Sequence, residues 1–323
     1  MTYDFSAYAG KRVLVTGADG FIGSHLTERL LELGANVSIF VRGTSMADAG
    51  KRHLKNIHHL SSSFEQIIPG DIASDDVVKL IKKLKPDIIL HLAAEAYVPK
   101  SFTQPMGVYE VNLGGTLNVL EAARSLESIE RVVITSSSEV YGSYDVAIDE
   151  EKVLNPTSPY GASKVAADRA GHAWYVTYQL PVSIIRPFNT YGPRHTYDVV
   201  PKFISLGIEE KPLTIYGSGE QSRDFTYVSD TVDGFLLMGI HPKAIGETVN
   251  FGAGSAVSIN ELASEIVRIS GSTSEITHVD TRPAEVERLT CDYSKARRLF
   301  GWEPRVQLAE GLAKNIEWAR ENR

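Results

Sequence analysis

Apolar residues in the first 190 positions of the chain occur in two alternating patterns. Short apolar runs with many β-branched residues are typical of buried parallel strands, and stretches with apolar residues three or four apart are typical of amphipathic helices. We expect helices over 21–34, 74–84, 105–125 and 158–179. We expect strands over 13–15 and 36–42, within 64–72, and over 86–94, 131–138 and 182–189.

Repeated strand–helix–strand units predict an α/β fold with a doubly wound parallel sheet, the Rossmann arrangement, in which ligands bind beyond the carboxyl ends of the strands. After Asn189 the alternation becomes irregular, with a short strand expected over 213–217 and helices over 258–270 and 308–321. We interpret this part as a smaller α/β lobe that binds the substrate. The expected domains are 1–187, to which 226–253 returns, and 188–323, so that the two are interleaved.

Three glycines separate the first expected strand from the helix that follows it. Gly17 allows a sharp turn off the strand, Gly20 lets a pyrophosphate approach the backbone, and Gly23 lets the helix pack closely. The helix N-terminus then directs free N–H groups and a partial positive charge at the phosphates. This strand, glycine turn and helix predict a dinucleotide-binding site.

The end of the second expected strand bears on the choice of dinucleotide. An acid at this position binds the adenosine ribose, whereas an arginine suits a 2′-phosphate. The strand ends at Arg42, with Thr44 and Ser45 beyond it and no acid in place, which favours tightly bound NADP over NAD. Arg42 is alternatively a solvated charge, or it stacks on the adenine of an NAD.

Other cofactor contacts are expected at the glycine turn and at the ends of the third and fourth strands. Asp71 is placed to reach the adenine, and the small side chains of Ala93 and Ala94 leave room for the cofactor. Asn112 is a further candidate, with support of the active-site backbone as its alternative role. The remaining expected contacts are Asp19, Phe21, Ile22, Ile72 and Leu92.

Composition narrows the class of protein. The 323 residues are 43% hydrophobic and 23% charged, as in ordinary globular proteins. A net charge of −7 argues against binding to nucleic acid or to anionic membranes. Cys291 is the only cysteine, the N-terminus has no long apolar run and no histidine pair has metal-ligand spacing. We therefore expect a cytoplasmic protein without a disulfide, a membrane span or a catalytic metal.

A tyrosine and a lysine four residues apart begin the expected helix over 158–179. Tyr160 and Lys164 share a helix face, and a nearby ammonium together with the positive nicotinamide ring would lower the high pKa of a tyrosine. Lys164 can also hold the nicotinamide ribose. Ser137 leaves the fifth strand and can bond the same substrate oxygen as Tyr160. These residues predict a proton-transfer site beside the nicotinamide.

With these motifs in place, the chain resembles the extended short-chain dehydrogenase/reductase family that modifies nucleotide sugars. The resemblance covers nearly the whole length, and its motifs are closest to GDP-mannose-type and related 4,6-dehydratases. It is carried by TGADGFIG (16–23), HLAAEAYVPKS (91–101), NLGGT (112–116), SSSEVYG (136–142), YGASK (160–164), RPFNTYGPR (186–194), RDFTYVSD (223–230) and LFGWEP (299–304).

The resemblance implies that hydride is taken from C4 of the sugar, that the 4-keto sugar reacts, and that hydride is returned. In related dehydratases the carboxylate at the position of Glu139 removes the C5 proton, and water leaves from C6. Many dTDP-glucose-type dehydratases carry Asp-Glu here, whereas this chain has Ser138 and Glu139, which leaves open who protonates the leaving hydroxyl. The alternatives are a 4-epimerase, a UDP-glucuronate decarboxylase, which shares the Ser-Glu pair, and a non-catalytic cofactor-sensing protein.

The resemblance also implies a nucleotide-diphosphate sugar as substrate. Arg223 and Arg288 resemble the two arginines that clamp the diphosphate, and Asn189 resembles a residue that bonds the same region; Arg282 is expected to be a surface charge. Helices over 105–125 and 158–179 are expected to pair with their copies in a homodimer through a four-helix bundle, as in related enzymes.

Overall fold

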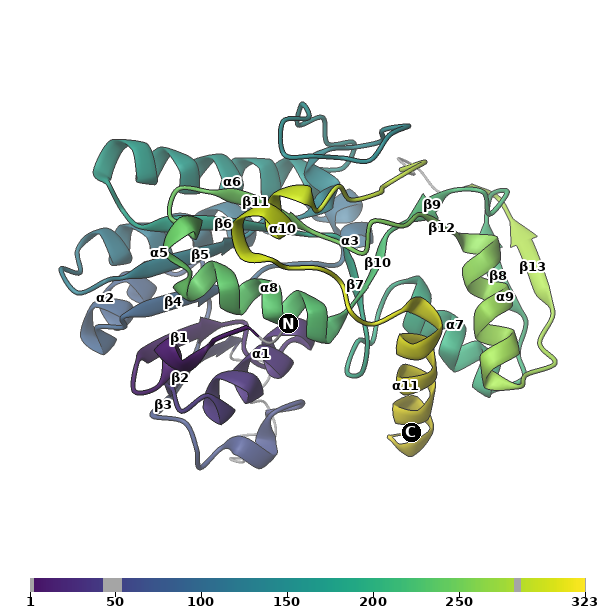
Figure 1. Cartoon of the computed structure of the whole chain (residues 1–323), viewed down its shortest axis with the longest axis horizontal. Coiled ribbons are helices and arrows are strands. Elements are labelled where there is room, and N and C mark those ends of the chain that lie inside the picture. Colours follow the sequence, from purple (N-terminus) through teal and green to yellow (C-terminus); the bar gives the residue numbers. More distant parts are fainter. Residues whose placement is uncertain (1–2, 43–53, 282–285, 323) are drawn as a thin grey trace. The chain divides into compact units, whose positions relative to one another are not determined.

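The computed structural model describes residues 3–42, 54–281 and 286–322 (Figure 1). Thr44, Ser45 and Arg282 lie outside the described residues. The chain divides into two compact units, which are described separately below. Unit 1 comprises Met1–Ser137, Pro159–Arg186 and Val232–Val249, and unit 2 comprises Ser138–Ser158, Pro187–Thr231 and Asn250–Arg323.

The main sheet has seven strands in the order β11-β6-β5-β4-β1-β2-β3. The paired registers from β3 across to β6 are all parallel, and β1 has β2 on one side and β4 on the other. This order confirms the predicted doubly wound α/β sheet, whose ligand side lies at the carboxyl ends of β1 and β4. The strands are β1 (Arg12–Thr16), β2 (Asn36–Arg42), β3 (Gln66–Gly70), β4 (Ile88–His91), β5 (Arg131–Thr135), β6 (Val182–Pro187) and β11 (Thr248–Phe251).

Helices pack against the main sheet through apolar side chains. One core cluster packs side chains of α2, α5 and α6 against alternate residues of the strands, with Leu14, Ile89 and Val132 among its fully buried members. On the other side, the Tyr8 hydroxyl donates to the Leu236 carbonyl of α8 at 3.0 Å. The helices are α1 (Phe21–Glu32), α2 (Asp76–Leu84), α3 (Val98–Thr103), α4 (Pro105–Tyr109), α5 (Gly115–Arg124), α6 (Pro159–Tyr178) and α8 (Val228–Ile240). None of the helices in the described ranges has both the length and the hydropathy needed to cross a bilayer.

The helix expected over 105–125 contains a π turn in the structure. A π-helical turn, η4 (Glu110–Gly114), lies between α4 and α5, and the Gly115 N–H donates to both the Glu110 and Val111 carbonyls. The Thr116 hydroxyl donates to the Asn112 carbonyl at 2.6 Å and occupies an acceptor within this turn. The predicted helix is confirmed in its extent, from Pro105 to Arg124, but the π turn within it was not predicted, because the apolar spacing does not register the extra residue of such a turn.

Unit 2 is built from short strand pairs and amphipathic helices. β7 (Asn189–Tyr191) pairs in parallel with β10 (Phe225–Tyr227), and β9 (Ser222–Arg223) pairs antiparallel with β12 (Val257–Ser258). A third, parallel pair joins β8 (Leu213–Tyr216) and β13 (Ile276–Val279). The helical segments are η5 (Ser138–Val140), α7 (Val199–Ile208), α9 (Ile259–Ser270), α10 (Ser294–Phe300) and α11 (Leu308–Glu321).

A buried ion pair fastens α6 to β6 within unit 1. The Arg186 Nε lies 2.8 Å from an Asp168 carboxylate oxygen, and both side chains are almost fully buried. Burial would raise the pKa of Asp168, but the charge of Arg186 overrides it and holds that pKa below its usual value. The pair therefore fixes α6, whose first turn contains Tyr160, against the sheet.

Removing one partner of this pair should destabilise the protein strongly. Asp168→Asn leaves the Arg186 charge buried without its counter-ion, so we expect a loss of about 3 kcal/mol or more in the free energy of unfolding, measured by urea titration. The control Glu130→Gln breaks an exposed ion pair with Lys11 and should cost less than about 1 kcal/mol. Equal losses in the two variants would contradict a structural role for the buried pair.

Candidate active site

The glycine turn brings β1, α1 and the end of β4 into close contact. Gly17 has φ +74, and a Cβ at this position would lie 2.8 Å from the Ala93 nitrogen. A Cβ on Gly23 would lie 2.2 Å from the Gly17 carbonyl oxygen, which real structures do not allow. The first and third glycines are thus required by the folded turn itself, and Gly17 presses against the backbone that leaves β4.

The N-terminus of α1 has the character of a phosphate site. Its N-cap is Gly20, which has no side chain to accept the first helical N–H groups, and no acidic residue lies in the first turn. The first turn of a helix directs backbone N–H groups outward, and the helix end carries a partial positive charge. The glycine turn and the N-terminus of α1 together fit the pyrophosphate of a nicotinamide dinucleotide.

Arg42 ends β2 as expected, but it is not isolated. Its guanidinium lies 3.6 Å from the Glu95 carboxylate, which also pairs with Lys100 at 2.6 Å. Neither partner was identified from the sequence, although both lie in the motif that follows β4. A 2′-phosphate at Arg42 would share this arginine with Glu95.

The other expected cofactor contacts are placed differently from one another. Both carboxylate oxygens of Asp19 accept backbone N–H groups, from Lys55 and Asn56. Asp71 is exposed after β3 and accepts the Ala73 N–H. Ile72 packs into the hydrophobic core. Leu92, Ala93 and Ala94 follow β4 and are all partly buried.

Asn112 supports backbone in the structure, which was its alternative role. Its amide oxygen accepts the Glu95 N–H at 2.8 Å, and its amide nitrogen donates to the Glu95 carbonyl and to the Ser163 hydroxyl. The Ser163 hydroxyl in turn donates to the Tyr160 carbonyl at 2.7 Å. The π turn therefore holds both the segment after β4 and the first turn of α6.

Tyr160 and Lys164 lie one turn apart at the start of α6, and both are buried. The Lys164 ammonium donates to the Thr135 carbonyl, at the end of β5, at 2.9 Å. Burial lowers the pKa of Lys164 to about 8, with Asp168 opposing the shift. Within the described residues, the ammonium donates one hydrogen bond, to the Thr135 carbonyl. Because a buried cation is costly, it is suited to pairing with a phenolate or with ribose hydroxyls.

The serines and the carboxylate after β5 fall on either side of the division between the units. Ser137 is the last residue of the first segment of unit 1 and is buried. Ser138 and Glu139 lie in η5 of unit 2, where Ser138 is buried and Glu139 is half-buried. The structure thus places a carboxylate in a short helical turn immediately after the serine.

Asn189 is the substrate candidate with the clearest structural signal. It begins β7, opposite Phe225 of β10. Its side-chain oxygen is buried and has no hydrogen-bond partner in the described part of the chain. A buried amide oxygen without a donor is unfavourable, so a ligand hydroxyl or water would satisfy it.

Arg223 and Arg288 lie on neighbouring segments of unit 2 but differ in their surroundings. Arg288 forms a β-bridge with Ser222, so alternation along β9 places the Arg223 side chain on the other face. The Arg223 guanidinium donates to the Val286 carbonyl at 2.6 Å. The next residue after Arg223 is Asp224, whose buried carboxylate accepts the N–H groups of Ala253, Gly254 and Cys291. Asp224 was not identified from the sequence, although it belongs to the RDF motif.

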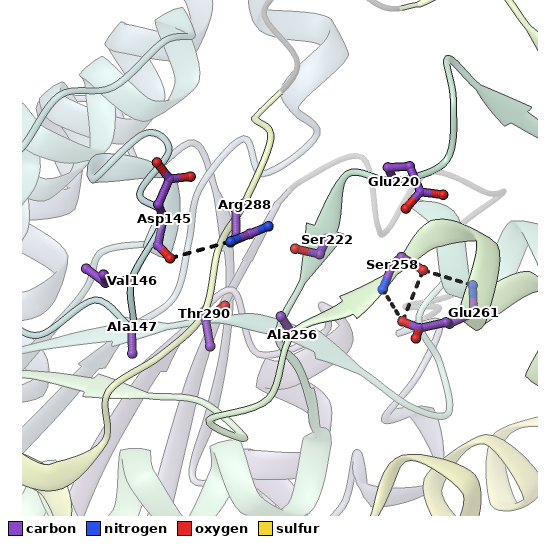
Figure 2. A pocket seen from close by; sticks show the side chains of 10 residues that line it. All are labelled: Asp145, Val146, Ala147, Glu220, Ser222, Ala256, Ser258, Glu261, Arg288 and Thr290. Carbon is purple, nitrogen blue, oxygen red and sulfur yellow. Dashed lines mark hydrogen bonds between the residues drawn. The ribbon is translucent and has the colours of Figure 1, made fainter.

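Figure 2 shows a pocket of about 460 Å³ within unit 2, into which Arg288 projects. Arg288 donates weakly to the Asp145 carbonyl at 3.5 Å, and among the described residues no carboxylate lies within ion-pair distance of it. Two acidic side chains in the pocket are held by their neighbours, since Glu261 caps α9 and Glu220 accepts from Asn260. The lining consists of Asp145, Val146, Ala147, Glu220, Ser222, Ala256, Ser258, Glu261, Arg288 and Thr290.

The sheet order, the glycine turn and the Tyr160–Lys164 pair define a fold and site of the short-chain dehydrogenase/reductase type. The family model described as GDP-mannose 4,6 dehydratase matches residues 14–315. The chain therefore belongs to this family, within the extended short-chain dehydrogenase/reductase group of nucleotide-sugar dehydratases and epimerases.

Individual relatives include both dehydratases and epimerases. The chain is 38% identical over 323 residues to dTDP-D-glucose 4,6-dehydratase of Bos taurus, covering 97% of this chain and 89% of the relative. It is 36% identical over 316 residues to UDP-glucose 4-epimerase of Mycolicibacterium smegmatis, covering 96% and 98%. The dTDP-glucose 4,6-dehydratase DesIV of Streptomyces venezuelae, solved with NAD and a second ligand bound, superimposes with a TM-score of 0.87 at 33% identity, covering 97% and 98%.

These findings support a nucleotide-sugar enzyme that uses a nicotinamide cofactor. They confirm the class of protein predicted from the sequence.

The glycine turn can be tested directly. Gly23→Ala forces a Cβ against the Gly17 carbonyl, so the turn must open and the N–H groups at the start of α1 move away from the phosphates. We expect the Kd for the nicotinamide dinucleotide to rise about tenfold or more, measured by titration calorimetry. Gly107→Ala is the matched control, because a Cβ there meets nothing within 4 Å. Unchanged affinity in Gly23→Ala would remove the turn from the cofactor site.

Proposed function

We propose that the protein is a nucleotide-sugar 4,6-dehydratase that forms a 4-keto-6-deoxy sugar nucleotide. The observation that carries the proposal is Glu139, a half-buried carboxylate held in η5 two residues after Ser137. A 4-ketone acidifies the C5 proton, and a positioned carboxylate is a suitable base for its removal. A 4-epimerase would leave Glu139 without a part in the reaction.

In this proposal the residues of unit 1 perform the redox steps. A nicotinamide bound at this site would supply the hydride chemistry, as acceptor and then donor of one hydride. Tyr160 removes the proton of the C4 hydroxyl, Ser137 donates a hydrogen bond to the same oxygen, and the Lys164 ammonium stabilises the phenolate. The buried position of Lys164 strengthens this effect, because its charge is poorly screened.

Residues of unit 2 supply the elimination and the grip on the substrate. Glu139 removes the C5 proton and water leaves from C6; Glu139 itself or a water molecule protonates the departing hydroxyl. Arg288 and Arg223 bind the diphosphate as a guanidinium binds phosphate oxygens, and Asn189 bonds the same region. The exposed guanidinium of Arg288 and the unsatisfied oxygen of Asn189 support these roles.

The reaction type is tested by incubating the purified protein with UDP-, GDP-, CDP- and dTDP-sugars and measuring product masses. Loss of one water is the expected result. An unchanged mass with altered sugar signals in NMR would identify the 4-epimerase, which the mycobacterial relative supports. Loss of carbon dioxide would identify a decarboxylase, and no turnover of any sugar would favour a binding protein.

The assignment of Glu139 makes a separate prediction. Glu139→Gln should abolish exchange of the C5 proton with solvent and lower product formation by about a hundredfold or more, while C4 oxidation continues. Deuterium incorporation from D₂O, followed by NMR, measures the exchange, and absorbance of the reduced cofactor measures the oxidation. Glu151→Gln, which changes an exposed glutamate of the same segment of unit 2, is the control. Full turnover in Glu139→Gln would exclude it as the base.

For the cofactor we propose tightly bound NADP, because β2 ends in Arg42 with no acidic residue next to it in the sequence. The pairing of Arg42 with Glu95 and the NAD bound to DesIV argue the other way. Denaturing the purified protein and identifying the released dinucleotide decides the question. Release of NAD alone would overturn the proposal.

We also propose a homodimer formed through a four-helix bundle of α4–α5 and α6 from two copies. Apolar side chains exposed on this part of unit 1 support it: Met106 is 79% exposed, and Val176 is 55% exposed. Light scattering at micromolar concentration should give twice the mass of one chain. A monomeric mass would contradict the proposal.

A further inference from the structure

A row of buried polar groups crosses unit 1 from the end of β1 to the first turn of α6. Its five members are at most 3% exposed, so each polar atom depends on a partner within the protein. None of the five transfers a proton in the reaction proposed above. They are Thr16, His91, Thr116, Asn112 and Ser163.

His91 occupies the centre of this row, and both ring nitrogens have partners. Nδ1 lies 2.8 Å from the Thr16 hydroxyl, and Nε2 lies 3.1 Å from the Thr116 hydroxyl. The Thr16 hydroxyl also accepts the Ala93 N–H at 3.1 Å, on the backbone that presses against Gly17. The imidazole thus lies between the cofactor turn and the start of α5.

The hydrogen-bond inventory fixes the tautomer of this imidazole. The Thr116 hydroxyl has one proton and gives it to the Asn112 carbonyl, which can only accept. Thr116 must then accept from His91, so the proton is on Nε2. Nδ1 is therefore the acceptor, and Thr16 donates to it. Every group is satisfied only when His91 is neutral.

Two connections lead from His91 to the catalytic pair. Through Thr116, the row continues to Asn112, whose amide donates to Ser163, whose hydroxyl donates to the Tyr160 carbonyl.

The second connection uses the backbone of His91. Its carbonyl accepts the Thr135 hydroxyl at 2.7 Å, and the Thr135 carbonyl accepts the Lys164 ammonium at 2.9 Å. One residue is therefore linked to Thr16, to Tyr160 and to Lys164.

We propose that His91 is a positioning residue, whose neutral imidazole fixes the glycine turn and the end of β4 relative to Tyr160 and Lys164. The inference rests on the proposed hydride transfer, which requires the nicotinamide and the phenol at one fixed separation. Burial, with the charge of Lys164 in support, lowers the pKa of His91 to about 3, so the imidazole stays neutral at working pH. It acts by geometry and does not gain or lose a proton during turnover.

The test removes one hydroxyl without touching a catalytic group. Thr116→Val keeps the side-chain shape but removes both the acceptor for His91 and the donor for Asn112. We expect kcat to fall about tenfold, with the KM for the nucleotide sugar within about twofold, because displaced catalytic groups affect the reaction more than substrate binding. Thr116→Ser restores the hydroxyl and should recover at least a third of the wild-type kcat. Equal kcat in the valine and serine variants would overturn the proposal.

A spectroscopic measurement tests the row independently of activity. In ¹⁵N NMR of the histidine-labelled full chain, His91 should show a protonated Nε2 and an unprotonated Nδ1 from pH 5 to 9. The signal should change in Thr116→Val and return in Thr116→Ser. An Nδ1–H tautomer, or titration near the ordinary histidine pKa, would refute the inference even if the enzyme proves to be an epimerase.

A second variant, in which an unchanged His91 signal shows that the fold is retained, separates the two connections. Ser163→Ala breaks only the link from Asn112 to the Tyr160 carbonyl, so kcat should fall while the His91 signal stays unchanged. If wild type turns over no nucleotide sugar, the proposed function fails, and the NMR result still decides whether His91 is held as described. An unchanged kcat in Ser163→Ala would show that the row does not position Tyr160.

Discussion

The burial of the Lys164 ammonium is the constraint on which the rest of the site depends. A cation that is 5% exposed loses most of its hydration, and this burial lowers its pKa to about 8. The protein compensates with one carbonyl, that of Thr135, and with the Asp168 carboxylate one turn along α6. The arrangement leaves the ammonium attractive to any other anion or hydroxyl that enters, which is what a phenolate or a ribose requires.

The compensation explains features that lie away from the chemistry. Asp168 can remain ionised in the interior because Arg186 pairs with it, and this pair also fixes α6 against β6. The Thr135 residue that supplies this carbonyl is held by its own hydroxyl, which donates to the backbone carbonyl of His91. The imidazole of His91 in turn requires the hydroxyls of Thr16, which ends β1 before the glycine turn, and of Thr116, in the helix after the π turn. The cofactor end and the catalytic end are thus parts of one buried polar structure.

Sequence reasoning succeeded where the determining residues are close together in the chain. The glycine turn and the Tyr160–Lys164 pair are local patterns with a local physical cause, and the alternating strands and helices follow from periodicity. The row through His91 could not be predicted, because Thr16 and His91 are 75 positions apart and neither residue type marks a site by itself. The π turn escaped for a different reason: Asn112 and Gly115 sit in a sequence whose apolar spacing fits an ordinary helix. The pairing of Arg42 with Glu95 likewise depends on the sheet order, which brings residues beyond β2 and β4 to the same edge.

The division of roles between the units explains why similarity alone does not identify the reaction. The dehydratases and the epimerases among the relatives are both named for reactions at C4 of the sugar, and the candidate redox groups of this chain, Ser137, Tyr160 and Lys164, all belong to unit 1. The carboxylate that would separate the two reactions, Glu139, belongs to unit 2, as do the candidate substrate residues. In the proposed dehydration, Glu139 is the group that acts on the oxidised sugar, and measurement of proton exchange at C5 addresses that step directly.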